Sequence, residues 1–200
     1  MRLEHGHVPR LDRHIARMEA SARHFGFPWR PESVREAVAA AARTHPEGTW
    51  RLRLLLDKDG AASVECAALE QASSHVPWRV AFAAEPVDHH DPFILNKTTH
   101  REVHDHARRS MPDVNDVLLW NRKGEVTEST IGNVVAGIGG VRYTPPVGCG
   151  LLAGTFRAEL LEAGALHERV LTKADIANAA HLWIINSVRE WMDAELVGSW

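Results

Sequence analysis

The sequence predicts an α/β fold of the α+β type, built as two modules. In the first half, two stretches carry apolar residues at helical spacing, and the segments after them alternate apolar and polar residues as strands do. A proline-rich and acidic segment, EPVDHHDPF, then precedes a second set of helical and strand-like stretches. The predicted organisation is a small domain at residues 1–85, a linker at 86–96 and a larger domain at 97–200.

Two helices are predicted to open the first module. The first lies in the stretch of residues 10–27 and ends at Gly26, with Pro28 beyond it. The second covers residues 31–45, where Pro31 suits a first helical turn. The face of the first helix is defined by apolar residues three or four positions apart, namely Leu11, Ile15, Met18, Ala22 and Phe25.

Antiparallel strands are predicted for the remainder of the first module. The segment at 49–57, TWRLRLLLD, has the alternation and apolar weight of a strand. A turn at DKDG leads from it into a second strand at 61–69. The segment at 77–85, PWRVAFAAE, is predicted as a third strand of the same module.

The second module is predicted to begin, after an extended DPFIL, with an amphipathic helix at 96–109 that carries Lys97 in its first turn. Strands, turns and two further helices follow. Their predicted positions are strands at 116–121 and 141–146, a strand-and-turn unit at 126–138, a glycine loop running into a helix at 149–164, a short helix at 173–179 and a strand at 181–188.

Composition excludes several classes of function. The chain has 200 residues, is 44% hydrophobic and carries a net charge of -3, which does not favour binding to nucleic acid or to a membrane surface. Two distant cysteines predict neither a disulfide framework nor a structural zinc site. No leader peptide and no apolar run of membrane-spanning length is present, so a cytoplasmic location is expected. The 13 histidines are scattered, without an HExxH motif, and no metal site is predicted.

The segment LLAGTFRAELL is a candidate phosphate site. Gly154 stands at the turn into a helix, where backbone N–H groups of Gly154, Thr155 and Phe156 can bind an anion. Simple capping of the helix by the Gly-Thr pair is the alternative interpretation.

Two charged residues are candidates for chemistry. Glu128 lies among small and β-branched residues, where a carboxylate is either an exposed edge charge or the buried partner of a cation. Lys97 is either a solvated surface residue or a nucleophile whose pKa is lowered by partial burial and by cations such as Arg101. A lysine, a carboxylate and a helix end for phosphate are the three fixed points that pyridoxal phosphate needs.

These motifs resemble the class IV pyridoxal-phosphate family. The resemblance covers nearly the whole chain, from the first helix through FILNKTTHREVHDHAR, the unit at 115–135, YTPPVGCGLLAGTFRAELLE and LWIINSVREW. It is nearest to the aminodeoxychorismate lyase-like members, and the family also contains branched-chain and D-amino-acid aminotransferases. It implies the two-domain, D-amino-acid aminotransferase-like fold, with pyridoxal 5'-phosphate bound between the domains.

The resemblance also implies roles for single residues. Lys97 would be the Schiff-base lysine and proton carrier, Glu128 the partner of the pyridine nitrogen, and Arg17 a ligand of the cofactor phosphate. The phosphate turn would be Gly154, Thr155 and Phe156, braced by Arg157, with a further contact from Asn186 and Ser187. Arg53 and Arg189 are candidates for binding a substrate carboxylate, and an exposed strand charge or a local salt bridge is an equal alternative.

The chain departs from the family pattern in three places. His100 and His104 stand where close relatives usually have an asparagine and a tyrosine. Phe156 replaces a frequent threonine of the phosphate turn, so that only its backbone can bind phosphate. Relatives also have a strand, with a threonine that assists the lyase reaction, ahead of the position of Met1.

The activity that the resemblance implies is release of pyruvate from aminodeoxychorismate to leave 4-aminobenzoate, on the folate route. Two alternatives stay open. One is a transaminase acting on branched-chain or D-amino acids, and the other is a protein that binds pyridoxal phosphate without turnover because the first strand is missing. The family is dimeric, so a homodimer is expected.

Overall fold

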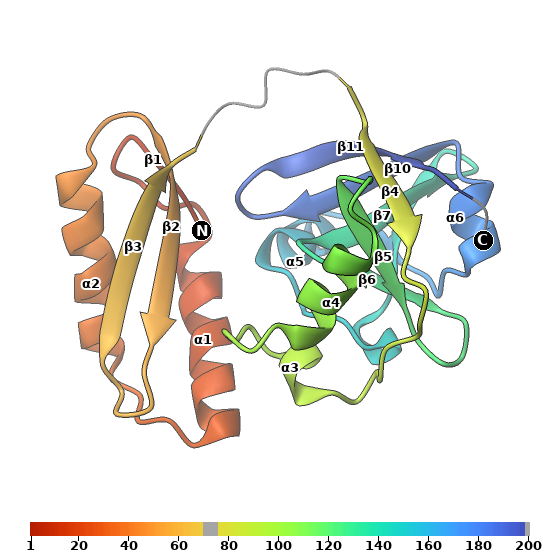
Figure 1. Ribbon diagram of the computed structural model, residues 1–200. Coiled ribbons are helices and arrows are strands. Elements are labelled where there is room, and N and C mark those ends of the chain that lie inside the picture. The colour runs from red at the N-terminus through yellow and green to blue at the C-terminus, as the bar shows by residue number, and fades with distance from the viewer. Residues whose placement is uncertain (70–75, 199–200) are drawn as a thin grey trace. The chain divides into compact units, whose positions relative to one another are not determined.

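A computed structural model describes residues 1–69 and 76–198 (Figure 1). The chain divides into two units, residues 1–74 and residues 75–200, and each is described by itself. The elements of the first unit are β1 (Arg2–Glu4), α1 (Leu11–Phe25), α2 (Pro31–Thr44), β2 (Thr49–Leu56) and β3 (Ala62–Ala68).

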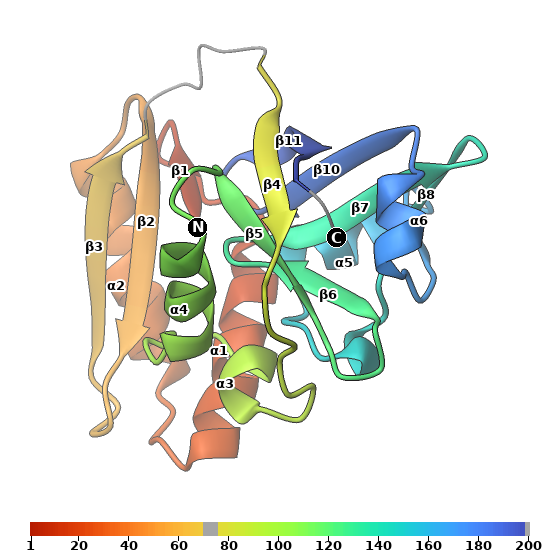
Figure 2. The same cartoon turned by 45° about the vertical axis from the view of Figure 1, so that its right-hand side comes forward.

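The first unit is an antiparallel sheet of three strands in the order β1-β2-β3, covered on one face by α1 and α2 (Figures 1 and 2). Both predicted helices and the hairpin of β2 and β3 are confirmed, whereas β1 was not predicted. α1 ends as expected at Gly26, whose φ of 72° is a left-handed conformation that glycine adopts without strain. The apolar core between sheet and helices contains Leu3, Val8, Val38 and Leu52.

The second unit holds the larger sheet. Its strands are β4 (Trp78–Phe82), β5 (Asp116–Trp120), β6 (Val126–Ser129), β7 (Asn133–Ile138), β8 (Val141–Thr144), β9 (His167–Glu168), β10 (His181–Asn186) and β11 (Glu190–Leu196). Its helices are α3 (Pro92–Leu95), α4 (Glu102–Ser110), the 3-10 turn η1 (Val147–Cys149), α5 (Thr155–Glu162) and α6 (Lys173–Ala177).

The larger sheet has eight strands in the order β10-β11-β4-β5-β6-β7-β8-β9, and β10 also pairs with β7. The strands from β10 to β7 therefore close into a ring, from which β8 and β9 extend. Residues of β5, β6 and β7 are buried as continuous runs, as expected for strands that are covered on both faces. One apolar cluster includes Val80, Leu118, Val134 and Ile184, and a second, which includes Ile94 and Ala107, packs α3 and α4 against β5.

The prediction that residues 77–85 form a third strand of the first module is wrong. β4 is a strand, but it lies in the larger sheet, parallel to both β11 and β5 (Figure 2). The two units divide at residues 74 and 75, ahead of the linker expected at 86–96. Residues 86–96 instead contain α3 and a bridge between Val87 and Asn121, both within the second unit.

The expected helix at 96–109 is shorter than predicted. α4 begins at Glu102, and the preceding DPFIL is helical rather than extended. The Asp91 carboxylate caps α3 by accepting a hydrogen bond from the Phe93 N–H at 2.8 Å, and Pro92 occupies the first turn. Over residues 1–69 and 76–198, no helix has both the length and the apolar character needed to cross a lipid bilayer.

Candidate active site

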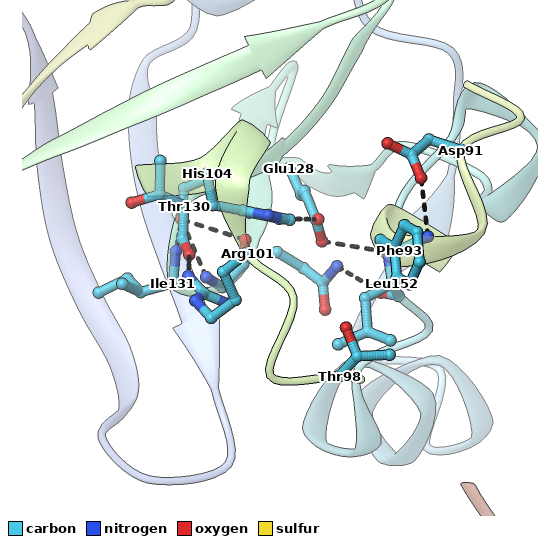
Figure 3. A network of polar contacts seen from close by, with 12 residues as sticks. Asp91, Phe93, Thr98, Arg101, His104, Glu128, Thr130, Ile131 and Leu152 are labelled. Carbon is cyan, nitrogen blue, oxygen red and sulfur yellow. Dashed lines mark hydrogen bonds and ion pairs between the residues drawn. The ribbon is translucent and has the colours of Figure 1, made fainter. Parts of the chain in front are cut away.

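Glu128 is a buried carboxylate at the centre of a polar network. It lies on β6 with 4% of its surface exposed. One of its oxygens, Oε1, is 3.0 Å from Nε2 of His104 on α4, and the other, Oε2, accepts a hydrogen bond from the Leu152 N–H at 3.1 Å (Figure 3). The structure thus favours the buried interpretation of Glu128 over an exposed edge charge.

A second contact joins α4 to the same part of the sheet. Arg101, at the N-cap position of α4, donates from Nη2 to the Thr130 carbonyl oxygen at 2.6 Å (Figure 3). The Thr130 hydroxyl in turn donates to the buried carboxylate of Asp116, at the start of β5. Arg101 and His104 therefore fasten the first turn of α4 to the segment at 128–130.

Lys97 lies in an irregular segment between α3 and α4, and its side chain is exposed. The prediction that it sits in the first turn of a helix is wrong, because α4 starts five residues later. Local hydrogen bonds occupy this segment instead. The Thr98 hydroxyl donates to the His100 carbonyl at 3.0 Å, and the Asn96 amide donates to the Pro92 carbonyl at 3.1 Å.

The segment before α5 connects Glu128 to the predicted phosphate turn. Gly154 is the N-cap residue of α5 and, as a glycine, has no side chain of its own to cap the helix. Two residues earlier, Leu152 donates its N–H to Glu128 and accepts a hydrogen bond from the Asn133 amide at 2.9 Å. The structure therefore brings Glu128 together with Gly154, Thr155 and Phe156. A helix N-terminus attracts anions through its exposed N–H groups and its dipole.

Asn186 and Ser187 lie where β10 turns into β11. The Asn186 side-chain oxygen accepts hydrogen bonds from the backbone N–H groups of Val188 and Arg189, both at 2.9 Å. Its amide donates to the Ile131 carbonyl at 3.4 Å. This turn is thus tied to the turn that follows Glu128, and it also contains Arg189.

Arg17 and Arg53 belong to the first unit. Arg17 is half-buried on α1, and its role toward the cofactor phosphate stays a prediction. Arg53 is exposed on β2 and pairs with Glu65 on β3 at 3.2 Å. This is the local salt bridge that was the alternative interpretation of Arg53, and its role with substrate also stays a prediction.

A cleft of about 680 Å³ lies in the first unit, between the start of α1 and α2. It contains none of the predicted site residues. Its lining carries several arginines, one of which, Arg35, is paired with Asp12 at 2.9 Å. The buried network around Glu128 is therefore a separate feature of the molecule.

Sequence reasoning missed several members of the network around Glu128. Asp116 was treated only as a strand residue, and the contacts of Asn133 and Leu152 were not expected. Arg157 was expected to brace the phosphate turn. It is almost completely buried and instead donates to the Pro145 carbonyl at 2.7 Å and to the Glu168 carboxylate at 2.5 Å. No sequence pattern singled out Asp116, because it is the first residue of its strand and follows Asn115.

Comparison with known proteins agrees with this architecture. The family model described as "Amino-transferase class IV" matches residues 1–197. A Schizosaccharomyces pombe protein named "Putative aminodeoxychorismate lyase" is 33% identical over 193 residues, which cover 90% of this chain and 80% of that protein.

Solved structures show the same fold. A putative amino-acid aminotransferase from Mesorhizobium loti has a TM-score of 0.89 and 34% identity, covering 98% of this chain and 97% of that one. A hypothetical aminotransferase from Mycobacterium tuberculosis, solved in an α-ketoglutarate and PMP bound form, has a TM-score of 0.83 and 21% identity, covering 98% and 79%. The expected fold is therefore confirmed, and the match of the family model over nearly all residues shows that the chain belongs to the class IV amino-transferase family of pyridoxal-phosphate-dependent enzymes.

Proposed function

We propose that this enzyme is an aminodeoxychorismate lyase that uses pyridoxal 5'-phosphate to release pyruvate and 4-aminobenzoate. The observation that carries the proposal is the position of Leu152, whose N–H binds Glu128 two residues before Gly154, the N-cap residue of α5. One short segment thereby links a buried carboxylate to an anion-binding helix end. The 33% identity to the S. pombe protein named as a lyase supports the choice of reaction.

The residues present fit the two polar ends of pyridoxal phosphate. Each oxygen of an ionised carboxylate accepts about two hydrogen bonds, and the contacts of Glu128 described above use one at each oxygen. Glu128 would accept a hydrogen bond from the protonated ring nitrogen. Gly154, Thr155 and Phe156 would hold the phosphate, with Asn186 and Ser187.

When bound, the cofactor supplies an aldehyde that reacts with an amine, and a ring that withdraws electrons. Lys97 would provide the amine, which must be neutral to react, and would then move a proton. Lys97 is exposed, in the irregular segment between α3 and α4. Glu128 keeps the ring nitrogen protonated, so that the ring continues to withdraw electrons.

Lys97 is tested by absorbance. The protein is incubated with pyridoxal phosphate and then desalted. We expect the wild type to keep an absorbance band near the edge of the visible range, and we expect Lys97→Ala to lose this band. Lys123→Ala, which removes an exposed lysine from the turn before β6, should keep the band. If Lys97→Ala and the wild type have the same spectrum, Lys97 is not the amine that binds the cofactor.

The reaction is tested with the loaded protein. Aminodeoxychorismate should yield pyruvate and 4-aminobenzoate in equal amounts when no keto acid is added as an acceptor. A transaminase is the second candidate, favoured by the 34% identity to the M. loti protein named as a putative amino-acid aminotransferase. It would act only when an amino acid and a keto acid are both present, with Arg53 and Arg189 as candidates for the carboxylate.

A cofactor-binding protein without turnover is the third candidate. It would show the lysine-dependent band but no product from either substrate set. A homodimer is also part of the proposal, because the resemblance implies one, and light scattering should give a mass near twice that of the 22.2 kDa chain.

A further inference from the structure

His104 makes the closest described contact between α4 and the buried carboxylate of Glu128. The two side chains are 8% and 5% exposed, and Nε2 lies 3.0 Å from Oε1. A buried carboxylate is strongly destabilising unless hydrogen-bond donors surround it. Leu152 supplies one donor at Oε2, and His104 is placed to supply the second at Oε1.

The direction of this hydrogen bond follows from the chemistry of the two groups. An ionised carboxylate only accepts, so the proton between His104 and an ionised Glu128 must be carried by Nε2. The two donors reach Glu128 from different elements, α4 on one side and the segment before α5 on the other (Figure 3). Together they fix the plane of the carboxylate.

The position of His104 is itself fixed by its helix. Arg101 binds the Thr130 carbonyl at 2.6 Å, and α4 packs against β5 through Ala107 in an apolar cluster. The imidazole therefore cannot follow Glu128 if the carboxylate turns away. A charge-assisted hydrogen bond of this kind is about twice as strong as a neutral one.

We propose that His104 is a positioning residue for the cofactor, which donates from Nε2 to Glu128 and keeps the carboxylate directed at the ring nitrogen. The inference rests on the proposed function, in which Glu128 binds that nitrogen. His104 itself touches neither cofactor nor substrate in this scheme. It acts through Glu128, so its effect must depend on the presence of the ring nitrogen.

The test compares two ligands of the cofactor-free protein. One is pyridoxal phosphate, and the other is its 1-deaza analogue, in which a C–H group replaces the ring nitrogen. Dissociation constants are measured for the wild type, His104→Leu and His104→Gln. The glutamine amide can place a donor close to the position of Nε2, whereas leucine cannot. His106→Leu, on an exposed face of the same helix, is the matched control.

We expect His104→Leu to reduce the preference for pyridoxal phosphate over the analogue by about tenfold, which is the loss of one hydrogen bond to a charged group. His104→Gln should keep most of the preference, and His106→Leu all of it. Equal weakening of both ligands by His104→Leu, or no weakening, would overturn the proposal and leave His104 a structural residue. Thermal melting of each variant identifies unfolding.

The failure of the proposed function has a different signature. If the wild type binds pyridoxal phosphate and the deaza analogue equally well, Glu128 does not recognise the ring nitrogen and the cofactor assignment of Glu128 fails. If the wild type prefers pyridoxal phosphate and His104→Leu retains the full preference, only the role of His104 fails.

Discussion

The side-chain oxygen of Asn133 lies where a β-carbon on residue 154 would have to be placed. Asn133 begins β7, and Gly154 is the N-cap residue of α5. The same asparagine donates to the Leu152 carbonyl at 2.9 Å. The segment that carries both the Glu128 contact and the start of α5 is therefore held directly against the sheet, with no room for a larger residue at 154.

We expect Gly154→Ala to lower the free energy of unfolding by about 1–3 kcal/mol, because the added methyl group overlaps Asn133. The backbone φ of -66° at Gly154 suits alanine, so the cost is steric rather than conformational. Gly148→Ala, with no atom within 4 Å of the new methyl group, is the control. Urea unfolding measures both. The double variant Gly154→Ala with Asn133→Ala should lose less stability than the sum of the losses of the two single variants. If the losses were additive, the methyl group would not overlap Asn133.

Arg157→Met should cost about 2 kcal/mol or more, since it removes the donor to the Pro145 carbonyl and leaves buried polar groups unpaired. The Arg157 side chain is 3% exposed. Arg53 pairs with Glu65 on the surface, with both side chains more than half exposed, so Arg53→Met should cost less than about 0.5 kcal/mol. Both costs can be measured by urea unfolding. Similar values for the two variants would show that burial of the guanidinium does not control the cost.

His14 should make the protein less stable as the pH falls below neutral. Burial on α1, with Arg17, the N-terminal amine and Arg10 nearby, lowers the pKa of His14 from 6.5 to about 3. Between these values the unfolded chain binds a proton that the folded chain does not, so stability is complete above pH 6.5 and declines below it. At pH 5 the loss from this group is roughly 2 kcal/mol.

The measurement is urea unfolding at pH 7 and at pH 5. His14→Gln should lose less stability between these two pH values than the wild type does. His24→Gln, an exposed histidine on the same helix, should lose as much as the wild type. Identical pH dependence in the wild type and His14→Gln would show that His14 is protonated in the folded protein.

The two cysteines should react with a thiol reagent at very different rates. Burial, reinforced by the Glu125 carboxylate, raises the pKa of Cys149 to about 11, whereas Cys66 on β3 is only partly buried. The thiolate is the reactive form. At pH 8 we expect Cys66 to react with dithionitrobenzoate first and Cys149 to react on unfolding. Cys66→Ser should therefore lose the fast phase of the reaction. If it lost the slow phase instead, the assignment of the two cysteines would be reversed.

Local patterns predicted the elements of the fold well. The spacing of Leu11, Ile15 and Met18 gave α1, and Gly26 marked its end, because both signals depend on residues within a few positions of one another. The sheet to which β4 belongs could not be predicted in this way. Its partners, β5 and β11, lie far along the chain, and alternation of residues does not specify which strand pairs with which.

The site was predicted in part. The residue patterns made Glu128 and Gly154 candidates, the resemblance implied their roles, and the structure joins them through Leu152. That connection uses a backbone N–H, which no residue type reveals. The pairing of His104 with Glu128 was also beyond sequence reasoning, since a histidine on a polar helix is compatible with solvent as well as with a buried carboxylate.

The ring of strands in the second unit also determines when this unit can be completed during synthesis. Its closing contacts place β11 beside β4 and join residue 194 to residue 78, so nearly the whole chain must leave the ribosome before they form. Until then, β4 has an open edge on which other chains can pair. Contacts between residues this far apart in the chain form more slowly than those of neighbouring hairpins, such as β2 with β3.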